Sequence, residues 1–567
     1  MKQLALCLLG VGAALHVRVA LADPVDMVRM ERAIDLRVAS GDFMGTILVA
    51  RDGQVLLNNA YGLSNVALKI ASYPEVRFPL GSVTKQFTAA AILLLEERGK
   101  LSINDPIKKY LPDAPAAWDE ITLFHLLTQA SGIPNSMGLP RQDPKNERHF
   151  TPEQLVERLR DLPLEFRPGT SCNYSNSGYV LLGYLIEKIS GKSYERFLRE
   201  QLFAPLNMWN TKYEPSLAKI SHRARGYTRT PEGPVAARDS DLSVAFSAAG
   251  LYSTSGDLLK WVQGLYGGKV LKPASLQKMT TPHINHCAFG IDVESAPNGG
   301  QIYSQSGAIE GFETRVVYVP AEKLVVIVLA NLSGGAADDL VLDLRRVAEG
   351  DVDRLVSDRV PVSLSPQALE RLTGHYWSED GSLITVLRKD DHLQAEGTGQ
   401  TLDLYPQSVR QFFAKTQNVE VTFTDDDEGR IESLLFRLGD HPLHAARITE
   451  AMARELAAER DRKLREQTPT PGSETALRQL LDEIIAGTVD YSRLGAGFAE
   501  VARRRLPRMH ELLDHLGAIR HTDFMGVAPV TGADIYRVTF ERGTVEVRIS
   551  LGPDGKIWSQ AMRSGQS

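Results

Sequence analysis

The sequence predicts an α/β protein in which an antiparallel sheet is flanked by helices and interrupted by a helical insertion. A small all-β barrel and a small α+β domain are expected to follow. Three observations predict this order. Apolar strand pairs lie at residues 45–60 and 315–329, segments with helical spacing lie between them, and short strand-like runs recur beyond Val352.

Length and composition set the number of domains and exclude one class of partner. The chain has 567 residues, too many for one hydrophobic core, and its net charge of -6 gives no electrostatic reason to expect nucleic acid. We expect a signal peptide at 1–22, a first domain at 23–352, a barrel at 363–447, a charged helix and linker at 448–474, and a small α+β domain at 475–567.

The first residues have the pattern of a cleavable secretory signal. Lys2 precedes the apolar stretch from Leu4 to Leu15, and Ala20-Leu21-Ala22 forms an Ala-x-Ala site that would release Asp23. About a dozen apolar residues are too few to cross a bilayer, so the mature chain is expected to have no transmembrane span. The sequence therefore predicts a periplasmic or secreted protein.

Two cysteines, Cys172 and Cys287, remain after this cleavage. The sequence leaves open whether they pair or stay as two buried thiols, because spacing along the chain does not show proximity. The predicted fold does not depend on a disulfide.

Each element of the first domain follows from a local pattern. Helical spacing, an apolar run beside a turn, or a β-branched run supports each of them. We expect helices at 26–40, from Ser82 to about 95, at 122–128 and at 178–188, with strands at 45–50, 54–60, 315–320 and 324–329. The last two strands are joined by a short loop, which predicts an antiparallel pair in the centre of a sheet.

Beyond Val352 the strand-like runs are short and closely spaced, which favours a small barrel or sandwich. They lie at 383–388, 392–395, 402–405, 411–414, 419–423 and 433–436. A helix with charges of both signs is expected at 449–467 and a Pro-rich linker at 468–473. The final domain is expected to have helices at 475–485 and 506–516 and strands at 534–540, 544–551 and 557–562.

Ser82-Val83-Thr84-Lys85 is the first candidate for chemistry. On a helix, residues three apart share a face, so the Ser82 hydroxyl and the Lys85 amine would lie within one turn. A desolvated amine with a lowered pKa can accept the serine proton and produce a nucleophile. The same spacing recurs at Ser216 to Lys219 and at Ser275 to Lys278, so the spacing alone also fits a solvated helix start.

Tyr174-Ser175-Asn176 is the second candidate, and it lies in a loop before a helix. A tyrosine near a lysine can ionise to a phenolate and act as a base, because the positive charge favours the ionised form. The alternative is a turn tyrosine packed on the surface.

The third candidate is the stretch from Gln305 to Phe312, which includes Ser306, Gly307 and Ala308. Glycine lets a substrate approach the backbone closely, and an exposed strand edge can offer an N–H group to an oxyanion.

Taken together, these stretches resemble the serine β-lactamase and penicillin-binding protein family, particularly its class C-like branch, which includes esterases and D-amino-acid peptidases. The resemblance covers Asp23 to about Glu349 and includes Phe166-Arg167-Pro168-Gly169 and Gly250-Leu251-Tyr252-Ser253-Thr254. It implies a β-lactamase/transpeptidase-like fold and a small-molecule or short-peptide substrate, with neither cofactor nor metal. The oligomeric state stays open.

The resemblance also implies a role for each candidate. Ser82 would be the acylated nucleophile, Lys85 its proton partner and Tyr174 the general base. Asn176, with Gln305, Ser306 and Gly307, would bind the substrate. The backbone N–H groups of Ser82 and Ala308 would form the oxyanion hole.

Gln305 departs from the family pattern, which has Lys or His at this position. A neutral amide supplies no cation to a substrate carboxylate, so hydrolysis of a neutral ester or amide fits better than β-lactam hydrolysis. The alternatives are a penicillin-recognising β-lactamase or DD-peptidase, and a binding or sensor protein of the same fold with weakened catalysis. The region from Ser363 to Arg447 resembles the lipocalin-like barrels appended to some of these peptidases.

Overall fold

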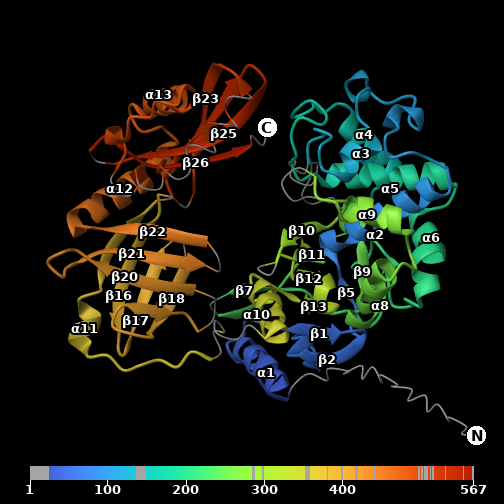
Figure 1. Ribbon diagram of the computed structural model, residues 1–567, viewed down its shortest axis with the longest axis horizontal. Coiled ribbons are helices and arrows are strands. Elements are labelled where there is room, and N and C mark those ends of the chain that lie inside the picture. The colour runs from blue at the N-terminus through green and yellow to red at the C-terminus, as the bar shows by residue number, and fades with distance from the viewer. Residues whose placement is uncertain are drawn as a thin grey trace, which may run out of the picture.

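The computed structural model describes residues 24–135, 149–350 and 358–564, with short gaps inside the last two ranges and residue 355 in addition. The predicted signal peptide with its cleavage site, Cys287 and most of the helix predicted at 506–516 lie outside the described residues. A six-stranded antiparallel sheet, a closed eight-stranded barrel and a four-stranded sheet follow one another along the chain (Figure 1). The predicted fold class is confirmed, while the domain boundaries stay a prediction.

The six-stranded sheet is the framework of the first domain, and its order is β10-β11-β12-β13-β1-β2. Its strands are β1 (Gly45–Arg51), β2 (Gln54–Tyr61), β10 (Asp292–Ser295), β11 (Gln301–Ile309), β12 (Phe312–Val319) and β13 (Leu324–Ala330). Strand β13 is buried along its whole length and lies between β12 and β1, as its unbroken apolar run predicts.

Helices cover both faces of this sheet. On one face, α1 (Pro24–Ala39) and α10 (Ala337–Glu349) pack against alternate residues of β1 and β13, including Ile47 and Val326. On the other face, α2 (Thr84–Glu97) and α8 (Ser255–Tyr266) pack against the residues between them, such as Leu48 and Ile327. The period of two along each strand produces these two layers.

The helical insertion lies between β2 and β10 and surrounds α2, whose residues are buried from Thr84 to Leu95. Its other helices are α3 (Leu123–Leu127), α4 (Pro152–Arg160), α5 (Asn176–Ser190), α6 (Tyr194–Leu198), α7 (Phe246–Ala249) and α9 (Pro273–Thr280). Its short strands are β3 (Leu63–Asn65), β4 (Ile70–Ala71), β5 (Phe78–Pro79), β6 (Lys212–Tyr213), β7 (Tyr227–Thr230), β8 (Gly233–Ala236) and β9 (Leu251–Ser253). Strand β14 (Leu332–Ser333), which follows β13, pairs with β7.

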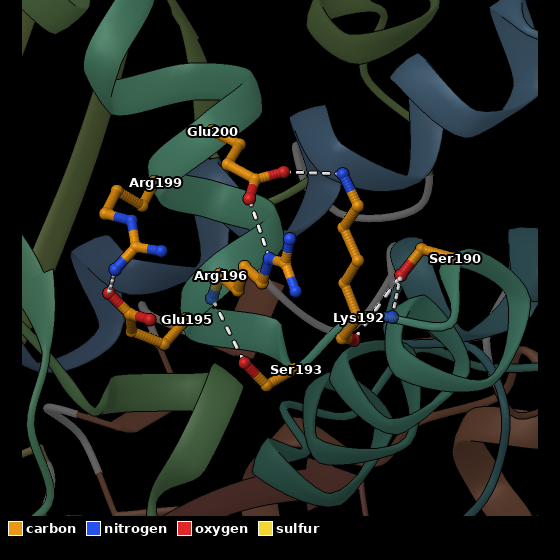
Figure 2. Close-up of polar contacts among 7 residues, drawn as sticks. All are labelled: Ser190, Lys192, Ser193, Glu195, Arg196, Arg199 and Glu200. Atoms are coloured by element: carbon orange, nitrogen blue, oxygen red, sulfur yellow. Dashed lines mark hydrogen bonds and ion pairs between the residues drawn. The ribbon is translucent and has the colours of Figure 1, made fainter.

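The junction of α5 and α6 shows how surface residues end one helix and start the next. Gly191 ends α5 in the left-handed conformation, and the Ser193 hydroxyl accepts the backbone N–H of Arg196 to cap α6. Figure 2 shows Glu200 binding both Lys192 and Arg196 beside this cap. Exposed ion pairs of this kind contribute about 1 kcal/mol or less to the free energy of unfolding. The network therefore stabilises a helix end but does not determine the fold.

The second unit is a closed barrel, which confirms the barrel that the short strand runs predict. Its strands are β15 (Gly374–Ser378), β16 (Leu383–Lys389), β17 (His392–Gly397), β18 (Gln400–Pro406), β19 (Gln411–Phe413), β20 (Val419–Asp425), β21 (Ile431–Leu438) and β22 (His441–Ile448). The short helix α11 (Pro366–Glu370) precedes it. Apolar side chains such as Tyr376, Val386, Leu404 and Phe423 fill its interior, so it is a packed core.

The third unit packs α13 (Ser473–Ala486) on the sheet β23-β24-β25-β26. Its strands are β23 (Ile519–Val527), β24 (Asp534–Phe540), β25 (Gly543–Leu551) and β26 (Ile557–Ser564). The charged helix α12 (Glu450–Glu466) lies between this sheet and the barrel (Figure 1).

A buried ion pair ties α12 to the third unit. Lys463 Nζ lies 2.7 Å from Asp534 Oδ1, and the two residues are 4% and 0% exposed. Lys463 also donates to the Gly532 carbonyl, and Asp534 accepts the backbone N–H of Thr470. Asp534 therefore contacts both α12, through Lys463, and the segment that follows it, through Thr470, while the linker boundaries stay a prediction.

We expect Asp534→Ala to lower the free energy of unfolding of this unit by about 3 to 5 kcal/mol, because it leaves a buried ammonium without a counter-charge. Asp461→Asn is the matched control, since Asp461 makes an exposed pair with Arg460 on the same helix and should change stability by less than about 1 kcal/mol. Denaturant unfolding of the full chain measures both. Equal effects of the two substitutions would contradict the role of the Lys463 pair.

Candidate functional site

Ser82 and Lys85 lie on consecutive turns at the start of α2. Ser82 is in the 3₁₀ turn Gly81–Val83, and Lys85 is the second residue of α2. Lys85 Nζ lies 3.0 Å from Ser82 Oγ, so the three-residue spacing brings the two groups together. The other two copies of the motif differ, because Lys219 is exposed and Lys278 pairs with Glu96 at 2.8 Å.

The Lys85 amine is almost completely buried and contacts four oxygen atoms. It lies 2.6 Å from Tyr174 Oη, 2.7 Å from Asn176 Oδ1 and 3.0 Å from the Ala248 carbonyl, in addition to Ser82 Oγ. The residue is 1% exposed, and burial lowers its pKa to about 7. At neutral pH a large fraction of this amine is therefore uncharged.

The four contacts orient the lone pair of the uncharged amine. Asn176 Oδ1 and the Ala248 carbonyl can only accept hydrogen bonds, so the two amine N–H groups are directed to them. The lone pair then faces the hydroxyls of Ser82 and Tyr174, either of which can donate a proton. This arrangement can activate a serine hydroxyl.

Tyr174 completes this cluster from the loop before α5. Its hydroxyl makes a short hydrogen bond with Ser82 Oγ, and the Lys85 amine lies 4.6 Å from the centre of its ring. Tyr174 is 46% exposed as a residue, while its hydroxyl contacts Ser82 and Lys85 within the cluster. Burial raises the pKa of Tyr174, the hydrogen bond with Ser82 opposes this change, and the carboxylate of Asp292 adds to it. Burial therefore opposes formation of the phenolate that the sequence analysis considered, and the role of Tyr174 as general base stays a prediction.

Asn176 is the first residue of α5, and its side chain is directed toward Lys85. Its amide nitrogen Nδ2 lies 3.3 Å from Asn135 Oδ1, which also accepts the Asn176 backbone N–H. Gln129 Oε1 accepts the backbone N–H of Ser175 at 2.9 Å. These contacts orient the Asn176 side chain so that its Oδ1 accepts a hydrogen bond from the Lys85 amine. The substrate contact that the sequence predicted for Asn176 stays a prediction.

Strand β11 passes directly beside the Ser82 turn. A Cβ atom on Gly307 would lie 2.0 Å from the Leu80 carbonyl and 3.0 Å from the Ser82 nitrogen. Gly81 has φ of +55°, and a Cβ atom there would lie 2.7 Å from the Ala308 nitrogen. Strand β11 therefore lies close against the Ser82 turn, and an oxyanion hole formed by the amide groups of Ser82 and Ala308 stays a prediction.

The three residues of the third motif differ in exposure. Gln305 is 7% exposed and donates to the Ser306 carbonyl, Gly307 is buried, and Ser306 is exposed on the opposite face of β11. Strand β10 pairs only with β11 residues 301–304, so in the described part of the chain the edge from Gln305 onward has β12 as its only strand partner.

Sequence reasoning missed Asn135, Gln129 and the Ala248 carbonyl. Gln129 lies within the region that the resemblance covers, and in the structure it adopts φ of +61°, a left-handed conformation that its residue type does not signal. Cys172 Sγ donates to the Thr128 carbonyl nearby. Within the described residues, no group of three His, Cys, Asp or Glu side chains could hold a metal ion.

A family model with the description "Beta-lactamase" matches residues 30–350, which include the whole Ser82 cluster. The chain belongs to the β-lactamase family. It is a β-lactamase-related serine hydrolase. Among its relatives, penicillin-binding protein 4* of Bacillus subtilis (strain 168) is 29% identical over 70% of this chain and 93% of its own length. The putative penicillin-binding protein PbpX of the same strain is 30% identical over 52% of this chain and 72% of its own.

Solved structures show the same fold. The octameric penicillin-binding protein homologue from Pyrococcus abyssi covers 74% of this chain and 100% of its own, with a TM-score of 0.55 and 24% sequence identity. A second family model, a domain of unknown function (DUF3471), matches residues 358–450, where the barrel lies. Among the described residues, no helix has the length and apolar character needed to span a membrane.

Proposed function

We propose that this β-lactamase family member hydrolyses an ester or an amide bond through an acyl-enzyme on Ser82. The observation that carries the proposal is the buried Lys85 amine, which contacts both the Ser82 and the Tyr174 hydroxyl. Its lowered pKa supplies a base at neutral pH, and its contacts with Asn176 and Ala248 orient that base. We infer from residues 1–22 that the mature protein is periplasmic or secreted.

In the first half of the reaction, the Ser82 proton passes to the Lys85 amine, directly or through the Tyr174 hydroxyl, as Ser82 Oγ attacks the substrate carbonyl. The backbone N–H groups of Ser82 and Ala308 bind the resulting oxyanion, which in serine hydrolases is worth about 3 kcal/mol for each donor. When the intermediate collapses, the leaving alcohol or amine takes a proton from Tyr174, which Lys85 replaces. A water molecule then attacks the acyl group by the same route, so that Ser82 recovers its proton.

The open edge of β11 suggests how substrate would bind. Residues from Gln305 to Ile309 can pair with an extended substrate backbone, as a peptide adds to a sheet edge. A short peptide, including one with D-residues, or an ester of similar shape fits this edge.

The panel that tests the proposal contains p-nitrophenyl esters, D- and L-aminoacyl anilides and nitrocefin. A burst of product and an acyl adduct on the Ser82 peptide are expected. Saturable binding without an adduct would favour the alternative of a sensor protein.

The neutral Gln305 predicts weak activity on β-lactams. Gln305 shares a strand face with Gly307, which lies beside Ser82, so an imidazole at this position would bring a cation to the site. We expect Gln305→His to raise kcat/KM for nitrocefin about tenfold, equivalent to about 1.4 kcal/mol of charge attraction.

Ser304→His is the matched control for this substitution. It places the same side chain one residue earlier and on the other face of β11, and it should leave nitrocefin turnover unchanged. An unchanged rate in Gln305→His, or an equal rise in both variants, would show that the missing cation does not limit activity on β-lactams.

A further inference from the structure

The hydroxyl of Thr88 binds the backbone directly beside the Ala248 carbonyl. Thr88 follows Lys85 by three residues on α2, so the two side chains share a face of the helix. Lys85 donates to the Ala248 carbonyl at 3.0 Å, and Thr88 Oγ1 donates to the preceding carbonyl, that of Ser247, at 2.7 Å. Two consecutive carbonyls of α7 are therefore bound from α2, one by the reactive amine and one by the Thr88 hydroxyl.

Tyr194, the first residue of α6, fixes the direction of the Thr88 hydroxyl. Tyr194 Oη lies 2.6 Å from Thr88 Oγ1, and both residues are completely buried. The Ser247 carbonyl can only accept a hydrogen bond, so the single Thr88 proton is directed to it and the Tyr194 hydroxyl donates to Thr88. Burial raises the pKa of Tyr194, so this hydroxyl keeps its proton at neutral pH. Tyr194, Thr88 and the Ser247 carbonyl therefore form a hydrogen-bond relay from α6 through α2 to α7.

The turn that carries these carbonyls has a strained backbone. Phe246, directly before Ser247, adopts φ of +37°, a left-handed conformation that is rare for a bulky side chain. The Phe246 ring packs on the ring of Tyr194 with 5.1 Å between their centres, and the Ser247 hydroxyl donates to the Tyr179 carbonyl at 2.9 Å. A strained backbone persists only where its surroundings hold it. The position of the Ala248 carbonyl therefore depends on the contacts that its neighbours in the turn make.

We propose that Thr88 and Tyr194 are positioning residues for the Lys85 amine. Through the α7 turn they hold the Ala248 carbonyl where it accepts one amine N–H, so that the lone pair stays directed at the Ser82 hydroxyl. The inference rests on the proposed function, because it assigns both residues to the activation of Ser82. Without the Thr88 hydroxyl the amine would remain beside the serine but lose its fixed orientation, and activation of the serine would slow.

The test measures the rate at which a fluorophosphonate probe labels Ser82 in the full chain. In each labelling event the serine oxygen bonds to phosphorus, fluoride leaves, and Lys85 takes up the serine proton. The rate constant therefore reports activation of the hydroxyl, whereas the final labelled fraction, measured by intact-protein mass, reports how much of the protein is folded. A purely structural role would change the labelled fraction and leave the rate constant unchanged.

Thr88→Val replaces the hydroxyl with a methyl group and should lower the labelling rate constant about tenfold at an unchanged final fraction, because one hydrogen bond to the α7 turn is lost. Thr88→Ser keeps the hydroxyl and should restore the wild-type rate constant. A slow Thr88→Ser variant would show that the methyl packing of Thr88, and not its hydrogen bond, matters for the amine.

Tyr194→Phe removes the donor to Thr88 and should slow labelling by about threefold. Because both hydroxyls act through the same carbonyl, the double variant of Thr88→Val and Tyr194→Phe should be no slower than Thr88→Val alone. Losses that multiply in the double variant would show that the two residues act separately and would contradict the relay.

Thr46→Val is the matched control. Thr46 is also completely buried, on β1, but within the described residues its hydroxyl has no hydrogen-bond partner, so its removal should leave the labelling rate constant unchanged. If the rate constant of Thr88→Val equals that of the wild type, or if only its labelled fraction falls, the positioning role is overturned. Failure of the wild type itself to be labelled would instead contradict the proposed function of Ser82.

Discussion

Ser82→Ala is expected to lower turnover of a p-nitrophenyl ester by on the order of 10⁶-fold and to remove all labelling by a fluorophosphonate probe. The substitution deletes the oxygen atom that Lys85 and Tyr174 contact and leaves the rest of the cluster in place. The fold should be unaffected, because Ser82 is only partly buried and α2 is stabilised by its apolar face. Steady-state kinetics and intact-protein mass measure the two effects.

Ser216→Ala is the matched control for this prediction. Ser216 begins the same Ser-x-x-Lys spacing, but its lysine, Lys219, is exposed to solvent. Labelling and turnover of this variant should equal those of the wild type. Labelling that persists in Ser82→Ala would move the nucleophile to another residue and contradict the proposed function.

The Lys85 amine is expected to set the pH dependence of the reaction. Burial lowers its pKa to about 7, and only the uncharged amine can accept the Ser82 proton. For a neutral ester, kcat/KM should therefore fall about tenfold per unit as pH decreases below 7 and should be level above it. If a Tyr174 phenolate were the base, the rise would continue above pH 10, because burial raises the pKa of Tyr174.

The Lys85→Arg substitution distinguishes further between the Lys85 amine and the Tyr174 phenolate as the base. A guanidinium remains protonated at every accessible pH, so it can stabilise charge but accept no proton. We expect a loss of about 10³-fold in kcat/KM at pH 8 and a profile without the step near pH 7. If the kcat/KM profile of Lys85→Arg kept a step near pH 7, that step would belong to the titration of a different group.

The fold was predictable where one face of a strand or helix is uniformly apolar. Strand β13 and the buried helix α2 follow directly from their runs of Val, Ile, Leu and Ala. Strands β22 and β23 were missed because His441–Ile448 and Ile519–Val527 contain mostly polar or small residues. Pairing with their neighbours holds them in place, and such pairing leaves no local pattern.

The proposed site was predictable to the extent that chemistry depends on side-chain identity. The hydroxyls and the amine of the Ser82 cluster could be named from their spacing and context. The Ala248 carbonyl could not, because every residue carries a carbonyl and only the tertiary fold brings this one to within 3.0 Å of Lys85. The same holds for Asn135, which lies 41 residues from Asn176 along the chain.

The contact between Gly307 and the Leu80 carbonyl limits how this enzyme can diversify. Any side chain at Gly307 would separate β11 from the nucleophile turn, and Gly81 is restricted by its positive φ as well. Laboratory evolution toward new substrates should therefore conserve both glycines and accumulate changes at their neighbours. Ser306, exposed on the same strand, is the position where a mutational library can vary size and charge without displacing the nucleophile.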